Sequence, residues 1–100
     1  MRGNILIAGL GLIGGSIALA IKRAHEDATV IGYDVSNESL RLARSLGVID
    51  EAVPSFAHAA READVIVLAV PVVQTEQLLR ELAHLPLRSH VIITDVGSTK

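Results

Sequence analysis

The sequence GLGLIG, residues 9–14, decides the fold because of the two segments that flank it. The apolar run NILIA at residues 4–8 predicts a short β-strand. Residues 12–24 (LIGGSIALAIKRA) predict a helix that closes on two cations, which are favourable at a helix C-terminus. A G-x-G-x-x-G pattern between a strand and a helix is typical of a turn that approaches phosphate groups. The first 24 residues are therefore predicted to form a βα unit with a phosphate-binding turn.

Each glycine of this pattern has its own predicted role. Gly9 permits the tight turn after the strand, Gly11 lets the backbone approach a pyrophosphate, and Gly14 lets the helix pack closely on the sheet. The free N–H groups and the positive dipole end of the helix would add a favourable field for the phosphates. Alone, the pattern is also compatible with three glycines that merely make turns. Residues further along the chain decide between these readings.

An acidic residue stands where a ribose-binding carboxylate is expected. The second predicted strand, residues 29–33, runs into Asp34, twenty residues after Gly14 (34 − 14). A carboxylate there accepts hydrogen bonds from the ribose 2′-hydroxyl and repels a 2′-phosphate, and residues 35–38 (VSNE) contain no Arg or Lys to neutralise one. We therefore predict NAD rather than NADP as the ligand; the alternative for Asp34 is a solvated loop acid.

Strand and helix patterns alternate along the remainder of the chain. The strongest is the apolar run at residues 64–70, which Pro71 ends and which predicts a central parallel strand buried on both faces. The other predicted elements are a helix at 37–46 between the cap Ser36 and the stop Gly47, an edge strand at 48–53, a helix from Ser55 to Ala63, a helix at 75–85 with Leu78, Leu79, Leu82 and Leu85 on one side, and a strand at 91–94.

Right-handed crossovers turn this alternation into an α/β fold, a doubly wound parallel sheet with strand order 3-2-1-4-5. Ligands of such sheets bind outside the carboxyl ends of the strands, at the point where the strand order reverses. Pro71, Val72 and Val73, just past the central strand, are therefore predicted to form a wall of the crevice near the nicotinamide, although Pro71 is also compatible with a residue that merely ends the strand. Val70 and Pro71 are counted among the cofactor-binding residues.

Composition sets limits on the class of protein. A chain of 100 residues, half of them hydrophobic, predicts a single domain. A formal net charge of −2 offers no basic surface for nucleic acid, and the absence of cysteine excludes disulfides and thiolate ligands, so no metal site is predicted. Residues 5–21 resemble a secretory signal, but four glycines interrupt them at the spacing of the turn motif. A cytoplasmic protein outside the membrane is expected.

Four segments together resemble the prephenate/arogenate dehydrogenases of tyrosine biosynthesis: GLGLIGGS at 9–16, YD at 33–34, DVIVLAVPV at 64–72 and TDVGSTK at 94–100. The resemblance covers the whole chain. It implies an NAD-dependent oxidoreductase that removes a hydride and carbon dioxide from prephenate or arogenate and leaves an aromatic ring, as in the conversion of prephenate to 4-hydroxyphenylpyruvate. It places these residues at the cofactor: Gly9, Gly11, Leu12, Ile13, Gly14 and Asp34. It also places Ser98 near the substrate hydroxyl as a catalytic residue, whereas the residue type alone is equally compatible with a helix cap.

The resemblance also implies that the chain is one part of a larger enzyme. The family's catalytic histidine and its substrate-binding arginine fall beyond the position that matches Lys100. Residues 1–100 are thus expected to be the N-terminal NAD-binding domain, inactive alone, of an enzyme whose C-terminal helical domain binds substrate and forms a homodimer. The four histidines present are assigned no catalytic role: His25, His58, His84 and His90.

Three other functions are compatible with parts of the sequence. One is another NAD(P)-dependent dehydrogenase of the same architecture, such as an imine or 3-hydroxyacid reductase. A second is a non-enzymatic NAD-sensing domain, which would leave Ser98 without a purpose. The third is a purely structural α/β domain, and Asp34 argues against it.

Overall fold

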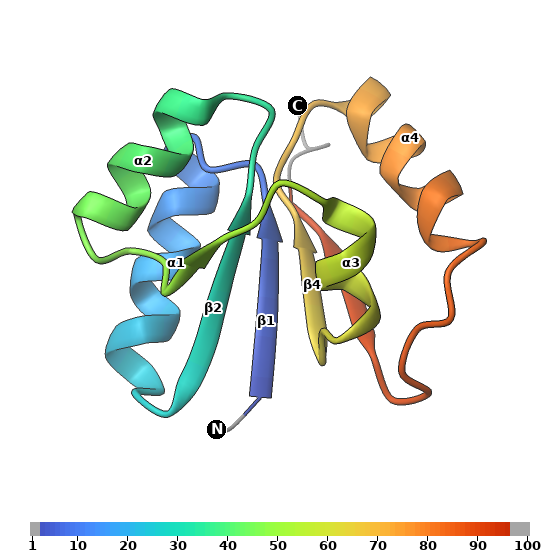
Figure 1. Cartoon of the computed structure of the whole chain (residues 1–100), viewed down its shortest axis with the longest axis horizontal. Coiled ribbons are helices and arrows are strands. Elements are labelled where there is room, and N and C mark those ends of the chain that lie inside the picture. Colours follow the sequence, from blue (N-terminus) through green and yellow to red (C-terminus); the bar gives the residue numbers. More distant parts are fainter. Residues whose placement is uncertain (1–2, 97–100) are drawn as a thin grey trace.

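Strands and helices alternate without exception in the computed structural model, which describes residues 3–96 (Figure 1). The elements are β1 (Gly3–Ala8), α1 (Leu12–Ala24), β2 (Ala28–Tyr33), α2 (Asn37–Ser45), β3 (Glu51–Ala52), α3 (Phe56–Arg61), β4 (Val65–Leu68), α4 (Val72–Leu82) and β5 (Ile92–Asp95). The predicted order of elements is confirmed, and α1 has the predicted bounds.

The five strands form one parallel sheet in the order β3-β2-β1-β4-β5, which confirms the predicted topology. β1 lies in the middle and pairs with β2 from Gly3↔Ala28 to Ala8↔Tyr33. On its other side β1 pairs with β4 from Ile5↔Val65 to Ala8↔Leu68. The chain thus leaves β1 in one direction and later returns to its opposite edge, so the strand order reverses between β1 and β4.

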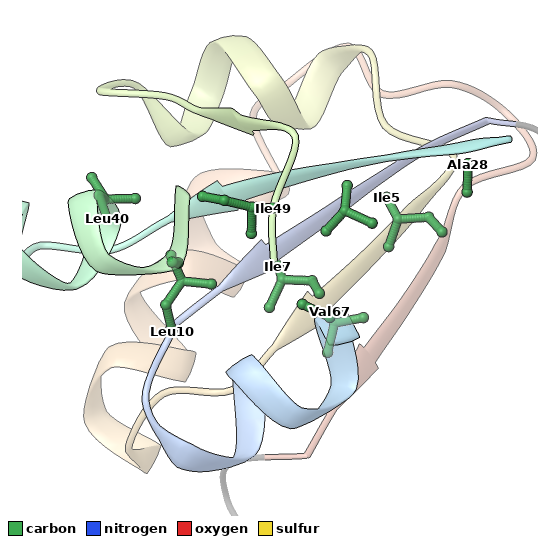
Figure 2. Close-up of a cluster of buried hydrophobic side chains, with 10 residues drawn as sticks. Ile5, Ile7, Leu10, Ala28, Leu40, Ile49 and Val67 are labelled. Atoms are coloured by element: carbon green, nitrogen blue, oxygen red, sulfur yellow. The ribbon is translucent and has the colours of Figure 1, made fainter. Parts of the chain in front are cut away.

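Helices cover both faces of this sheet, with α1 and α2 on one side and α3 and α4 on the other (Figure 1). Successive side chains of a strand point to opposite faces, so β1 contributes to two separate cores. Ile5 and Ile7 pack with α1 and α2 in the first core, part of which Figure 2 shows. Leu6 and Ala8 pack with α3 and α4 in the second core. This two-sided burial explains why the strands read as continuous apolar runs.

The sequence correctly predicted two helix caps and one helix end. The Ser36 hydroxyl accepts a hydrogen bond from the Ser39 N–H at 3.2 Å and caps α2 as predicted. The Ser55 hydroxyl caps α3 in the same way. Gly47 follows α2 with φ +73, the left-handed conformation that favours glycine at a helix end.

The predicted bounds of α4 were wrong. The helix begins at Val72, three residues before the predicted start at Thr75, and it ends at Leu82 instead of Leu85. Thr75 lies within the helix and is buried, and its hydroxyl donates to the Val70 carbonyl at 3.1 Å. The predicted leucine face is confirmed for Leu78, Leu82 and Leu85, which pack in the second core, whereas Leu79 is 43% exposed. β3 is likewise shorter than the predicted strand at 48–53.

Candidate functional site

The turn between β1 and α1 requires glycine at its first position. Gly9 has φ +98, and a Cβ there would lie 2.8 Å from the carbonyl carbon of Ala69. The Gly9 N–H donates to the Tyr33 carbonyl at 2.8 Å, so the turn is joined to the end of β2 as well as to the end of β4. A side chain at this position would be strained by the backbone conformation and would collide with a neighbouring strand.

Gly14 lies in the first turn of α1 and is packed against the turn itself. A Cβ at Gly14 would overlap the carbonyl oxygen of Gly9 and would lie 2.9 Å from its carbonyl carbon. It would also lie 3.3 Å from the Cβ of Ala69. The close approach of α1 to the sheet therefore depends on the missing side chain, which is the role that the sequence predicts for this glycine.

Gly11 differs from these two glycines because the fold does not require it. Its φ of −73 suits any residue. A Cβ there would meet no atom within 4 Å. Gly11 is the N-cap of α1 and supplies no side chain to cap it. The first N–H groups of a helix have no acceptor within the helix, so they are available to an anion. Open space above Gly11 is what a phosphate would need.

Leu12 and Ile13 follow at the start of α1. The side chain of Leu12 lies outside the described residues, and that of Ile13 is 54% exposed. Ile13 does not line the pocket that opens at the carboxyl ends of the strands. What these two positions can offer a ligand is the pair of backbone N–H groups at the positive end of the helix.

Asp34 connects the glycine turn to α2. One carboxylate oxygen, Oδ2, accepts a hydrogen bond from the Leu10 N–H at 2.7 Å. The other, Oδ1, accepts from the Ser36 N–H at 2.9 Å. Asp34 is half-buried, so it is not a freely solvated loop acid. Each carboxylate oxygen can accept more than one hydrogen bond, and both can therefore still accept from a hydroxyl group of a ligand.

A pocket of about 430 Å³ brings most of the predicted residues together. Five of them line it: Gly9, Gly11, Asp34, Val70 and Pro71. It opens where the carboxyl ends of β1, β2 and β4 meet, at the point where the strand order reverses. No lysine or arginine within residues 3–96 lines this pocket, while two acids do. Its volume lies in the range of small-molecule sites.

Sequence reasoning missed the contribution of α4 to this pocket. Gln74, Gln77, Leu78 and Glu81 line it from one side of the helix. Their spacing of three and four residues is a signal that could have identified them, although Gln74 lies before the predicted start of the helix at Thr75. Buried Thr75 holds the end of β4 through Val70 and so fixes the start of α4 against the pocket.

A separate charged cluster lies at the opposite end of the strands, where β1 and β4 begin. The Asp64 carboxylate accepts from the Asn4 N–H at 2.8 Å and contacts His90 Nε2 at 2.6 Å and Arg88 Nη1 at 3.0 Å. The Asn4 hydrogen bond, followed by those to His90 and Arg88, lowers the pKa of Asp64 from 3.8 to about 2. This cluster ties the loop before β5 to the start of β1. It is far from the carboxyl ends of the strands, and His90 therefore takes no part in the pocket.

Within residues 3–96, no group of three or more His, Asp or Glu side chains is placed to hold a metal ion. No helix in the same part of the chain is long and apolar enough to cross a membrane. Ser98 lies outside the described residues.

A doubly wound parallel sheet with a glycine turn after β1 and an acid at the end of β2 defines a nucleotide-binding domain of the Rossmann type. The sequence model for the nucleotide-binding domain of prephenate dehydrogenase matches residues 17–100. The chain belongs to this family.

Known relatives agree with this assignment. Prephenate dehydrogenase of Bacillus subtilis is 52% identical over 100 residues, which are all of this chain and 27% of that protein. The crystal structure of Aquifex aeolicus prephenate dehydrogenase in complex with hydroxyphenyl propionate and NAD+ has a TM-score of 0.84 and 33% identity, over 93% of this chain and 32% of that one. Synechocystis arogenate dehydrogenase has a TM-score of 0.83 and 30% identity, over 97% and 34% of the two chains. The chain therefore spans about a third of these proteins or less.

Proposed function

We propose that this chain binds NAD and forms the cofactor-binding part of a dehydrogenase that oxidatively decarboxylates prephenate or arogenate. One observation carries the proposal: a single pocket joins the open glycine, Gly11, to the carboxylate of Asp34. That pairing provides a place for a pyrophosphate beside a place for a ribose. The identity to the Bacillus subtilis enzyme and the NAD+ complex of the Aquifex aeolicus enzyme support the choice of cofactor and reaction.

Different residues would bind the pyrophosphate and the ribose of the cofactor. Gly11 leaves room for the pyrophosphate, and the N–H groups of Leu12 and Ile13 lie at the helix end that favours its charge. Asp34 would accept hydrogen bonds from the adenosine ribose, and its charge would disfavour a 2′-phosphate. When bound, NAD would supply the acceptor for the hydride that leaves the substrate.

Gly9 and Gly14 shape the turn, and Gly9 also lines the pocket. Val70 and Pro71 share a pocket with Asp34, so they would contact the adenosine side of the cofactor as well as any part that extends toward the nicotinamide. Their assignment to the nicotinamide end stays a prediction.

The remainder of the reaction belongs to a longer protein. Because the chain spans only 27% of the Bacillus subtilis enzyme, we assign it the role of an N-terminal domain. The substrate site and a homodimer interface would be formed by the additional part of such an enzyme, with Ser98 contributing a hydroxyl next to the substrate. The cytoplasm is the expected location of this biosynthetic activity.

Calorimetric titration of NAD and NADP tests the cofactor assignment directly. NAD should bind more tightly than NADP; the reverse order would contradict the role of Asp34. The variant Gly11→Val should unfold at the same urea concentration as the wild type, since a Cβ at this position meets no atom. The same variant should lose NAD binding because its side chain occupies the space for the phosphate. Undiminished affinity in a folded Gly11→Val variant would show that this turn does not hold the pyrophosphate.

A further inference from the structure

The side of α4 that faces the pocket carries polar side chains with no assigned task. Gln74, Gln77 and Glu81, together with Leu78, form one stripe along the helix. Thr75 and Leu82 are buried and Leu78 packs against the same core as Leu82, so these side chains hold the helix in place. The polar members of the stripe, Gln74, Gln77 and Glu81, are exposed and are not needed for packing.

Two apolar side chains from different elements line the same pocket. Val35, which directly follows Asp34, is 78% exposed and lines the pocket from the end of β2. Leu78 lines it from α4 and is half-buried. Walls of this kind suit a flat ring with apolar faces, and a pocket with apolar walls and a few polar groups is the usual form of a small-molecule site.

The order of the residues along the pocket indicates which ring this is. The glycine turn marks the place of the pyrophosphate, and Asp34 marks the place of the adenosine ribose. Val35 is the next residue along the chain and lines the same pocket as Asp34. The base attached to that ribose is adenine, so this step depends on the proposed function.

The polar groups of the stripe match the edge of an adenine ring. The side chains of Gln74, Gln77 and Glu81 make no hydrogen bond or ion pair within the described part of the chain, so their polar atoms are available to a ligand. Adenine presents an amino group that donates hydrogen bonds beside a ring nitrogen that accepts them. A glutamine can pair with both, and a carboxylate can only accept.

We propose that Gln77 and Glu81 determine base specificity by accepting hydrogen bonds from the exocyclic amine of adenine, which lies between Val35 and Leu78. Hypoxanthine carries a carbonyl oxygen in place of that amine. An oxygen there would face the acceptor oxygens of Glu81, and the domain therefore selects adenine dinucleotides over hypoxanthine dinucleotides.

The test compares NAD with nicotinamide hypoxanthine dinucleotide by calorimetry on the full 100-residue chain. The wild type should bind the hypoxanthine form about tenfold more weakly, a typical discrimination for one mismatched base edge. Glu81→Gln replaces the carboxylate by an amide that can donate as well as accept, so the ratio of the two dissociation constants should approach one. Glu76→Gln is the matched control: it makes the same charge change in α4, does not line the pocket, and should keep the wild-type ratio.

The possible results separate this inference from the proposed function. Equal affinity of the wild type for both dinucleotides would overturn the role of α4 and leave NAD binding intact. A ratio that stays the same in Glu81→Gln and Glu76→Gln would also overturn it. Absence of NAD binding by the folded wild type would overturn the proposed function, and the inference with it.

Discussion

Adding one methyl group to α1 should destabilise the domain at Gly14 and stabilise it at Gly15, the adjacent position. At Gly14 the new Cβ overlaps the Gly9 carbonyl oxygen and lies 2.9 Å from its carbon. These are backbone atoms of a turn whose own conformation is constrained, so they cannot rotate away. At Gly15 the nearest atom is the Leu10 carbonyl oxygen at 3.9 Å, an ordinary contact.

The size of the effect follows from two opposing terms. Replacing glycine by alanine inside a helix stabilises by about 0.5–1 kcal/mol, because glycine loses more conformational freedom on folding. Overpacking a close contact costs about 1–3 kcal/mol, and a clash with backbone belongs at the upper end of that range. The first term is shared by both variants and cancels in their comparison. The difference in unfolding free energy between Gly14→Ala and Gly15→Ala should therefore be about 2–3 kcal/mol.

Urea unfolding followed by far-ultraviolet circular dichroism measures this difference, and a thermal melt should show the two midpoints separated by roughly 10 °C for a domain of this size. Gly14→Ala should also weaken NAD binding, because relief of the clash displaces Gly9 and with it the turn. Gly15→Ala leaves the turn in place. If the two variants unfold at the same urea concentration, α1 does not depend on Gly14 for its approach to the sheet, and the packing role is refuted.

Two further predictions concern Asp34, at the carboxyl ends of the strands, and Asp64, at their amino ends. Asp34→Asn presents an NH2 group to one of two backbone N–H donors, so it should destabilise by about 1–3 kcal/mol in urea unfolding. It should also reduce the preference for NAD over NADP in calorimetry, because the repelling charge is gone. The pKa of Asp64 is lowered from 3.8 to about 2, so its stabilising contribution is present above pH 3.8 and is lost as the pH falls toward 2. The stability difference between wild type and Asp64→Asn, measured by urea unfolding at several pH values, should shrink over that interval.

Exposed acids provide the controls. Glu38→Gln in the first turn of α2 makes the same charge change as Asp34→Asn without lining the pocket, and it should leave the ratio of the NAD and NADP dissociation constants unchanged. An equal change in that ratio would mean that net charge, and not the position of Asp34, sets the preference. Glu26→Gln is the control for Asp64. A wild-type to Asp64→Asn difference that stays constant from pH 5 to pH 2 would contradict the role of the carboxylate contacts.

The features that the sequence predicts well depend on contacts between near neighbours. The glycine turn, the caps Ser36 and Ser55 and the alternation of apolar runs are all local, and right-handed crossovers convert them into the observed strand order. The start of α4 depends instead on a tertiary contact. Val72 and Val73 have low helix propensity, but the buried bond from Thr75 to Val70 fixes the helix over them.

In the candidate site, too, some positions follow from sequence spacing and others depend on tertiary contacts. The positions of Gly9, Gly11 and Asp34 follow from spacing, because the carboxyl ends of neighbouring parallel strands must meet at one edge. The stripe of α4 that completes the pocket depends on which side of the helix packs against the sheet, and residue spacing alone does not give that side. The two hydrogen bonds of Asp34 also lie beyond sequence reasoning, because they depend on the path of the turn.

These hydrogen bonds of Asp34 affect how a dinucleotide would be bound. Leu10 lies between two glycines of the turn, a segment that would otherwise have unusual conformational freedom. The bond from its N–H to Asp34 Oδ2 holds the turn in one conformation before any ligand arrives, which lowers the entropy that binding must remove. Since the same carboxylate can still accept from a ribose hydroxyl, Asp34→Asn should weaken NAD binding by two routes. The loss should therefore exceed that of one ribose hydrogen bond, and a smaller loss would mean that the turn keeps its conformation without Asp34.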